Sequence, residues 1–299
     1  MTRSLLDFFK KRDVECYRSF DISSISSIGI GAVADFAVFP NTAEKLVTTV
    51  DFLTEANVPY FIAGRLTNVL FSSSEFCGVV VFTTKIATYS TAELNVRADT
   101  GVAFSKLLRE ISALSLGGAE GVYGIPGSVG GMVYNNAGAF GASVSDFFLR
   151  ASLYSIKDKQ VVTFNKAQMD FGYRKSILHN RNYIFLSGEF EFFRKEKKKI
   201  DEDFAGSVAR RKATQPYGAK SLGSIFKRVD GIPVSKLIDD IGLKGFSVGG
   251  AEISKKHAGF IINTGGAVAS DVLSLISTIK EKLYANYGIV AEEEIEIIN

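Results

Sequence analysis

The sequence has few of the residues that build disulfide frameworks and metal sites. Its two cysteines, Cys16 and Cys77, stand far apart and form no CxxC pair, and its two histidines are His179 and His257. A zinc site needs a cluster of cysteine and histidine ligands, and a disulfide framework needs several cysteines at regular spacing. The sequence therefore predicts no metal site and no disulfide framework, and it favours a reducing compartment, the cytoplasm.

Long apolar runs and a strong charge imbalance are also missing. No stretch of about 20 apolar residues occurs, which is the length that a membrane-spanning helix requires. The apolar run near the N-terminus is too short for a signal peptide. The formal net charge of +3 is too small to indicate nucleic-acid binding. The 299 residues, 46% of them hydrophobic, predict a soluble globular chain of about two domains.

Glycine, in contrast, is concentrated in one stretch, GGAEGVYGIPGSVGGMVYNNAGAFG, which runs from Gly117 to Gly141. The stretch also contains several apolar side chains and only one charged residue, Glu120, so its composition is not that of a flexible linker. Glycine lets a ligand approach main-chain N–H groups, and consecutive N–H groups form nests that bind phosphates. A glycine-rich hairpin without a ligand is the alternative. Neither a G-x-G-x-x-G nor a P-loop pattern is present, which excludes both of those nucleotide-binding modes.

Apolar periodicity predicts a chain of mixed helices and strands. We expect helices at residues 4–12, from Thr42, and at 105–116, 206–213, 234–245 and 270–287. Strands are expected at residues 35–39, 60–63, 79–84, 95–103, within 148–164 and 183–193, and at the C-terminal end. The basic run RKEKKK, Arg194–Lys199, predicts a solvated connector between two parts of the chain.

Three polar positions are candidates for chemistry, each with an ordinary structural alternative. Ser224 lies in LGSIFK without a nucleophile elbow, so it would act as a proton donor or be only a turn residue. Arg174, in FGYRKSIL, has the charge and geometry to bind a carboxylate or phosphate, or it could form a structural ion pair. Glu292, Glu294 and Glu296 alternate along a terminal strand, and residue patterns alone do not select one of them.

Six segments, in this order, resemble the UDP-N-acetylenolpyruvoylglucosamine reductase (MurB) family. They are GRLTNVLF, GAEGVYGIPGSVGGMVYNNAGAFG, FGYRKSIL, QPYGAKSLGSIFK, GGAEISKKHAGFIINTG and the final EEEIEII. The resemblance covers about residues 24–298 and corresponds to the shorter, second type of the family, which lacks a tyrosine-loop insertion. It implies an α+β protein with a two-part FAD-binding region of the vanillyl-alcohol-oxidase (PCMH) type and a C-terminal α+β substrate domain.

The resemblance also implies boundaries and binding residues. FAD-binding subdomains would occupy residues 1–90 and 91–205, a substrate-binding domain 206–288, and a terminal strand 289–299. Non-covalent FAD would be held by Gly64, Arg65, Leu66, Thr67, Asn68, Gly124, Ile125, Pro126, Gly127, Ser128, Gly130, Gly131, Asn135, Asn136, Ala137 and Gly138. The substrate-binding residues would be Tyr173, Lys227, Arg228 and His257.

The implied reaction is the NADPH-dependent reduction of UDP-N-acetylglucosamine enolpyruvate to UDP-N-acetylmuramate for peptidoglycan synthesis. Reduced FAD would deliver hydride to the enolpyruvyl methylene carbon, Ser224 would supply the proton, and Arg174 and Glu294 would stabilise the developing charge. Proximity to the substrate carboxylate would favour a protonated Glu294. Alternatives are another FAD-dependent oxidoreductase of the same fold, or a non-catalytic protein that binds a UDP-sugar or flavin. A monomer or weak oligomer is expected.

The sequence departs from the family's commonest pattern at a few positions. Leu66 stands where many members have glycine in G-x-G-[ST]-N, Ala32 and Val33 replace Gly-Pro, and Glu296 replaces a frequent arginine. Leu66 restricts the backbone of a predicted flavin loop, so we expect it to be tolerated there only because the other residues of the loop are kept.

Overall fold

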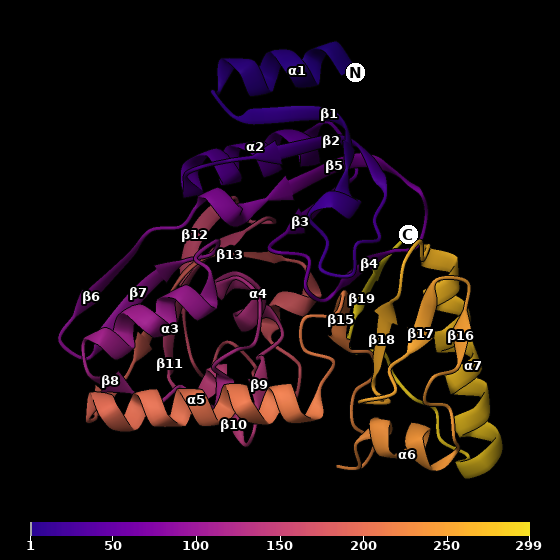
Figure 1. The fold of residues 1–299 in the computed structure, drawn as a ribbon. Coiled ribbons are helices and arrows are strands. Elements are labelled where there is room, and N and C mark those ends of the chain that lie inside the picture. The colour runs from indigo at the N-terminus through magenta and orange to yellow at the C-terminus, as the bar shows by residue number, and fades with distance from the viewer. Residues whose placement is uncertain (1) are drawn as a thin grey trace. The chain divides into compact units, whose positions relative to one another are not determined.

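The computed structural model describes residues 2–299 and divides the chain into two compact units (Figure 1). Unit 1 comprises the chain up to Arg18 together with Phe36–Arg65 and Gly78–Ala209. Unit 2 comprises Ser19–Asp35, Leu66–Cys77 and Arg210–Asn299. Each unit is therefore assembled from separate chain segments. The domain boundaries predicted above follow the order of the chain, and they stay a prediction.

The secondary structure mixes helices with antiparallel and parallel strands, as the α+β prediction requires. The helices are α1 Thr2–Lys11, α2 Ala43–Glu55, α3 Phe104–Ala113, α4 Val129–Tyr134, α5 Lys197–Thr214, α6 Val234–Asp240 and α7 Ala269–Tyr287. The longer strands are β1 Glu15–Asp21, β2 Val33–Phe39, β3 Tyr60–Ala63, β5 Glu75–Phe82, β6 Tyr89–Ala92, β7 Asn95–Asp99, β11 Phe148–Ser155, β12 Gln160–Asn165 and β13 Tyr183–Glu191. The shorter ones are β4 Val69–Phe71, β8 Leu116–Gly117, β9 Gly138–Ala139, β10 Ala142–Ser143, β14 Phe193–Arg194, β15 Ser221–Ser224, β16 Ser247–Val248, β17 Ala251–Ile253, β18 Phe260–Asn263 and β19 Glu296–Ile298.

The largest sheet is antiparallel and has the strand order β12-β11-β13-β7-β6. Alternation of apolar and polar residues predicted β11, β12 and β13 from the sequence, whereas β6 was not predicted. The apolar side of α3, with Leu107, Leu108 and Ile111, is buried in the same core. Met132 and Val133 of α4 are buried there as well, so the short helix of the glycine-rich segment is part of the core of unit 1.

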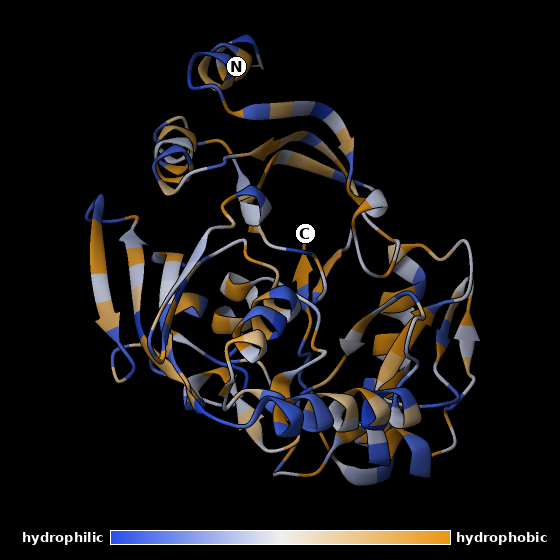
Figure 2. Cartoon of the chain, turned by 60° about the vertical axis from the view of Figure 1, so that its left-hand side comes forward, coloured by the Kyte–Doolittle hydropathy of each residue, from blue (hydrophilic) through white to orange (hydrophobic). Residues whose placement is uncertain are grey.

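A second sheet has the order β1-β2-β5-β3, with β3 and β5 parallel. Helix α2 begins at Thr42, whose hydroxyl accepts a hydrogen bond from the Lys45 N–H at 3.2 Å, as expected for an N-cap residue. Its apolar face buries Leu46, Val50 and Leu53. In Figure 2 much of the hydrophobic colour lies on the strands and on one face of the helices, which is the pattern that the periodicity predicted.

Unit 2 contains the antiparallel sheet β15-β18-β17-β16 together with α6 and α7. Helix α7 lies within one residue of its predicted start and ends at Gly288, whose φ of 66° is the left-handed conformation that favours glycine at a helix end. The C-terminal strand β19 pairs in parallel with β4, so Glu296 lies opposite Val69. The C-terminal strand was predicted, but its partner could not be read from the sequence.

The connector predicted after residue 193 is wrong for most of its length. Arg194 belongs to β14 and residues from Lys197 form the first turns of α5. Acidic residues four positions after the lysines stabilise a helix here: Lys197 pairs with Asp201, and Lys199 pairs with Asp203 at 3.2 Å. A basic run that is followed at this spacing by acidic residues therefore favours a helix over a disordered linker.

Candidate active site

Two segments predicted to hold a cofactor meet in unit 1. A Cβ atom added to Gly64, at the end of β3, would lie only 2.5 Å from the hydroxyl of Ser128. Ser128 is itself buried and is the N-cap of α4, where its hydroxyl accepts a hydrogen bond from the Gly131 N–H at 3.3 Å. The loop that begins at Gly64 and the glycine-rich segment are therefore in direct contact, although about 60 residues separate them in the sequence.

Glycine is required within this segment because the main chain at Gly130 packs directly against Thr100. A Cβ atom at Gly130 would lie 2.3 Å from the hydroxyl oxygen of Thr100, and the Gly130 N–H donates to the Thr100 carbonyl at 2.8 Å. Gly127 has a φ of 152°, and its carbonyl accepts a hydrogen bond from the Phe104 N–H at 3.1 Å. Thr100 was not among the predicted site residues, because nothing in its local sequence indicates that Gly130 packs on it.

The loop after Gly64 continues into unit 2 with Leu66, which has a φ of 48° and is buried. Its carbonyl accepts hydrogen bonds from the N–H and the hydroxyl of Ser27, at 3.3 and 3.2 Å. The left-handed conformation explains why glycine suits this position. A leucine there costs roughly 1 kcal/mol in backbone conformation, and burial of its side chain offsets that cost.

Arg174 is positioned by a turn that is tied to the glycine-rich segment. The Asn136 side chain donates to the Gly172 carbonyl at 3.0 Å and accepts from the Ser145 N–H at 2.9 Å. Arg174 has a φ of 53° and donates from its guanidinium to the Gly138 carbonyl at 2.9 Å. The guanidinium also lies 5.1 Å from the centre of the Tyr173 ring, and Tyr173 is exposed. The segment thus orients this cation through its own main chain.

In unit 2, Ser224 and Glu294 lie on neighbouring stretches of backbone. Ser224 ends β15, and the residue after it, Ile225, accepts a hydrogen bond from the Glu294 N–H at 2.7 Å. Asn68 binds Glu294 from the other side, because its side-chain amide donates to the Glu294 carbonyl at 3.0 Å. The Asn68 carbonyl also accepts from the Glu296 N–H at 2.9 Å. Three candidate residues from distant parts of the sequence are therefore connected within one unit.

The candidate substrate residues of unit 2 have different surroundings. Lys227 forms an ion pair with Glu292, and Arg228 beside it is exposed. His257 is partly buried and stacks edge-on against Phe260, with ring centres 4.9 Å apart. Its Nδ1 atom accepts a hydrogen bond from the Gly259 N–H at 3.1 Å. Burial, together with the nearby charge of Lys244, lowers the pKa of His257, so this imidazole is neutral at pH 7.

Two absences concern the part of the chain that the structure covers. None of the helices within residues 2–299 is long and apolar enough to cross a membrane. The same residues contain no group of three histidine, cysteine, aspartate or glutamate side chains that could hold a metal ion.

In the comparison with known proteins, the chain matches two family models. The model of the FAD binding domain matches residues 34–164, and the model of the UDP-N-acetylenolpyruvoylglucosamine reductase C-terminal domain matches residues 215–298. The reductase of Petrotoga mobilis is 39% identical and covers 91% of each chain, and that of Caldicellulosiruptor saccharolyticus is 36% identical and covers 97% of this chain and 94% of its own. The crystal structure of the reductase (MurB) from Thermus caldophilus matches with a TM-score of 0.81 and 29% identity, covering 96% of this chain and 99% of that one.

The lowered pKa of His257 predicts a pH-dependent stability. Below pH 6.5 the unfolded imidazole takes up a proton that the folded imidazole resists, so the free energy of unfolding falls as the pH drops from 7 to 5. A single group contributes a slope of at most about 1.4 kcal/mol per pH unit. We expect His257→Gln to flatten the profile in this range. Urea unfolding at pH 5, 6, 7 and 8 measures the profile. The difference at pH 8 gives the packing loss alone, and parallel profiles for the two proteins would contradict the prediction.

Proposed function

Because the chain belongs to the UDP-N-acetylenolpyruvoylglucosamine reductase family, we propose that it reduces UDP-N-acetylglucosamine enolpyruvate to UDP-N-acetylmuramate, a peptidoglycan precursor, with NADPH as the electron donor. The observation that carries the proposal is the pairing in unit 2, where the backbone beside Ser224 binds the backbone of Glu294. An addition next to a substrate carboxylate requires a proton donor for the carbon, and a protonated carboxyl group can stabilise the developing charge by a hydrogen bond.

The residues of unit 1 fit FAD. Residues 121–141 carry no charged side chain, so a diphosphate bound there would be held by main-chain N–H groups and by the small polar side chains of the segment. Arg65, on the loop that Gly64 begins, is exposed and would add a cation. The close contact of Gly64 with Ser128 brings these two sets of donors together. When bound, FAD supplies the two-electron chemistry that transfers a hydride from NADPH to the enolpyruvyl methylene carbon.

Arg174 and Glu294 have roles that follow from the charge of the transition state. Addition to the methylene carbon builds negative charge on the carbon next to the substrate carboxylate and on that carboxylate itself. A guanidinium whose orientation is fixed by the Gly138 carbonyl would stabilise this charge by charge-assisted hydrogen bonds. Glu294 would hydrogen-bond to the same group, and its main chain is fixed on both sides by Asn68 and Ile225.

Ser224 would donate the proton that completes the reduction. A hydroxyl is a weak acid, but an enediolate-like species is a strong base, so a positioned serine or a water bound to it suffices. The proposal also assigns roles along the chain. Residues 1–90 and 91–205 would hold FAD, residues 206–288 would hold the UDP-sugar, and residues 289–299 would supply Glu294. The UDP-sugar would also contact Tyr173 from the FAD-binding part, together with Lys227, Arg228 and His257.

An anaerobic absorbance experiment tests the activity directly. We expect the purified protein to show a flavin band that NADPH bleaches and that returns when the enolpyruvyl sugar is added. Absence of the band after reconstitution with FAD would indicate a protein that binds no flavin. Bleaching without recovery on addition of the sugar would indicate a different FAD-dependent oxidoreductase.

Substitution of Ser224 tests the proton donor. We expect Ser224→Ala to leave reduction by NADPH unchanged and to slow reoxidation by the enolpyruvyl sugar by about 10²- to 10⁴-fold, the range of general acid catalysis. Stopped-flow absorbance measures the two half-reactions separately. Ser221→Ala, on the same strand β15, is the matched control and should leave both rates unchanged. Reoxidation of Ser224→Ala at the wild-type rate would exclude the serine as the donor.

Asn68 allows two roles to be distinguished. If it only positions Glu294, Asn68→Ala lowers kcat by roughly tenfold or more, because small displacements of a reacting group are costly, and FAD affinity stays the same. If it only contacts the cofactor, FAD affinity falls and kcat at saturating FAD does not. Ser72→Ala is the control, because the Ser72 hydroxyl donates to the Ile298 carbonyl at 3.0 Å in the same pair of strands, away from Glu294. Because Asn68 is proposed to contact FAD and also hydrogen-bonds to Glu294, we expect both kcat and FAD affinity to fall, as measured by steady-state kinetics and flavin fluorescence.

A further inference from the structure

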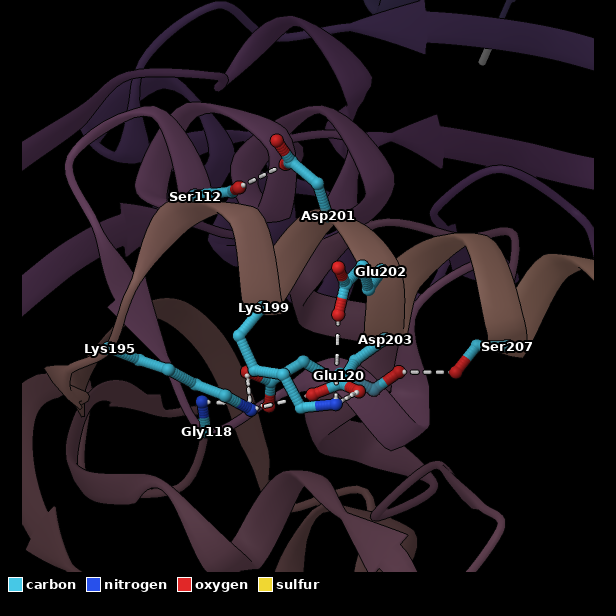
Figure 3. A network of polar contacts seen from close by, with 9 residues as sticks. All are labelled: Ser112, Gly118, Glu120, Lys195, Lys199, Asp201, Glu202, Asp203 and Ser207. Carbon is cyan, nitrogen blue, oxygen red and sulfur yellow. Dashed lines mark hydrogen bonds and ion pairs between the residues drawn. The ribbon is translucent and has the colours of Figure 1, made fainter.

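A network of charged side chains lies at the start of the glycine-rich segment, beside α5 (Figure 3). Its centre is Glu120, the first residue of a short 3-10 helix, Glu120–Val122. The side chain of Glu120 is 13% exposed. The Glu120 carboxylate accepts hydrogen bonds from the Lys195 ammonium at 2.8 Å and from the Gly118 N–H at 2.9 Å. A carboxylate this far from solvent requires such partners, because burial penalises its charge.

Lys195 has two carboxylate partners. It also donates to Asp203 of α5 at 2.8 Å, and the hydrogen bonds that it donates, to Asp203 first and then to Glu120, raise the pKa of Lys195. The second Asp203 oxygen pairs with Lys199, which lies on the outer side of the network and is 57% exposed. Lys195 therefore links the Glu120 carboxylate to Asp203 of α5, whereas Lys199 pairs with Asp203 and Glu202 on α5 itself.

Two further contacts join the same stretch of chain to α5. The Ser207 hydroxyl donates to the Glu120 carbonyl at 2.9 Å. The rings of Tyr123 and Phe204 stack with centres 3.8 Å apart and planes 1° apart. Asp203, Phe204 and Ser207 lie on one side of the helix, because residues three and four positions apart share a face. Residues 120–123 are thus held by an ion pair, a hydrogen bond and a ring contact.

These residues lead directly into Gly124–Gly131, the part of the segment proposed to hold the FAD diphosphate. Glycine-rich main chain loses more conformational freedom on ordering than other main chain, so ordering it on cofactor binding is costly unless its ends are already fixed. We propose that Lys195 is a positioning residue for the FAD-binding segment, which it fixes through Glu120. The inference rests on the FAD binding that is part of the proposed function.

Lys195 is the decisive member of the network. Without its ammonium, the largely buried Glu120 carboxylate would keep only the Gly118 N–H among the partners described above, and an unpaired carboxylate would move toward solvent and take residues 120–123 with it. Without Lys199, Asp203 would still have Lys195 and Glu120 would lose nothing. The two lysines carry the same charge and differ in whether they reach the segment.

The experiment compares Lys195→Met with Lys199→Met in the full chain. FAD is removed and titrated back, and flavin fluorescence gives its dissociation constant. We expect Lys195→Met to raise the dissociation constant at least tenfold, about 1.4 kcal/mol, and to speed hydrogen exchange in residues 117–131. Lys199→Met should stay within about twofold of the wild type, since an exposed ion pair contributes little. The KM for the enolpyruvyl sugar at saturating FAD should be the same in all three proteins.

Each other outcome has a definite meaning. Equal FAD affinities and equal exchange in the two variants would overturn the inference, and so would an equal loss of affinity in both, which would indicate a general effect of charge. A wild-type protein that binds no FAD would instead refute the proposed function. If Lys195→Met does not fold, Glu120→Gln replaces it. This variant keeps the shape of the side chain and removes the charge that Lys195 binds, so an unchanged FAD affinity would then count against the inference.

Discussion

The close approach of the main chain at Gly64 and Gly130 to the side chains of Ser128 and Thr100 is the constraint on which the candidate site depends. At Gly64 and at Gly130 a single Cβ atom would collide with a neighbouring hydroxyl. Glycine is therefore needed at these positions for packing, before any ligand is considered. The same close packing gives a flexible sequence a defined path, and a defined path is what a set of main-chain donors needs in order to bind a cofactor.

Three of the predicted site residues adopt a left-handed backbone without being glycine: Leu66, Asn136 and Arg174. Each such conformation costs on the order of 1 kcal/mol or more and persists only where neighbours hold it. The neighbours are visible in each case. Ser27 binds the Leu66 carbonyl, Asn136 binds Gly172, and Arg174 binds Gly138. Hydrogen bonds between residues far apart in the sequence therefore maintain the strained turns that carry the candidate residues.

How much could be predicted from the sequence differs between the fold and the site. Periodicity predicted α2, α7 and the antiparallel strands β11, β12 and β13, because burial on one face leaves a regular pattern. The prediction of a connector after residue 193 was wrong because it considered the basic run without the acidic residues that follow it at helical spacing. The motifs predicted the family, which the comparisons confirm. The candidate residues that the motifs predicted stay predictions. The bonds from Asn68 to Glu294 and from Asn136 to Gly172 left no local signal, because each joins segments whose proximity is created only by the fold.

The two lysines of the α5 network illustrate how one sequence feature can have two physical outcomes. Lys195 and Lys199 stand in the same basic run and share Asp203 as a partner. Lys199 is 57% exposed and its ion pairs are screened by water, whereas Lys195 is 24% exposed and faces a carboxylate that is 13% exposed. The sequence does not distinguish the two lysines, because both lie in one basic run. The burial of the partner carboxylate determines whether the ion pair is solvated or fixes a loop. For the same reason, the charge of a run indicates little about function until the side chains that it reaches are known.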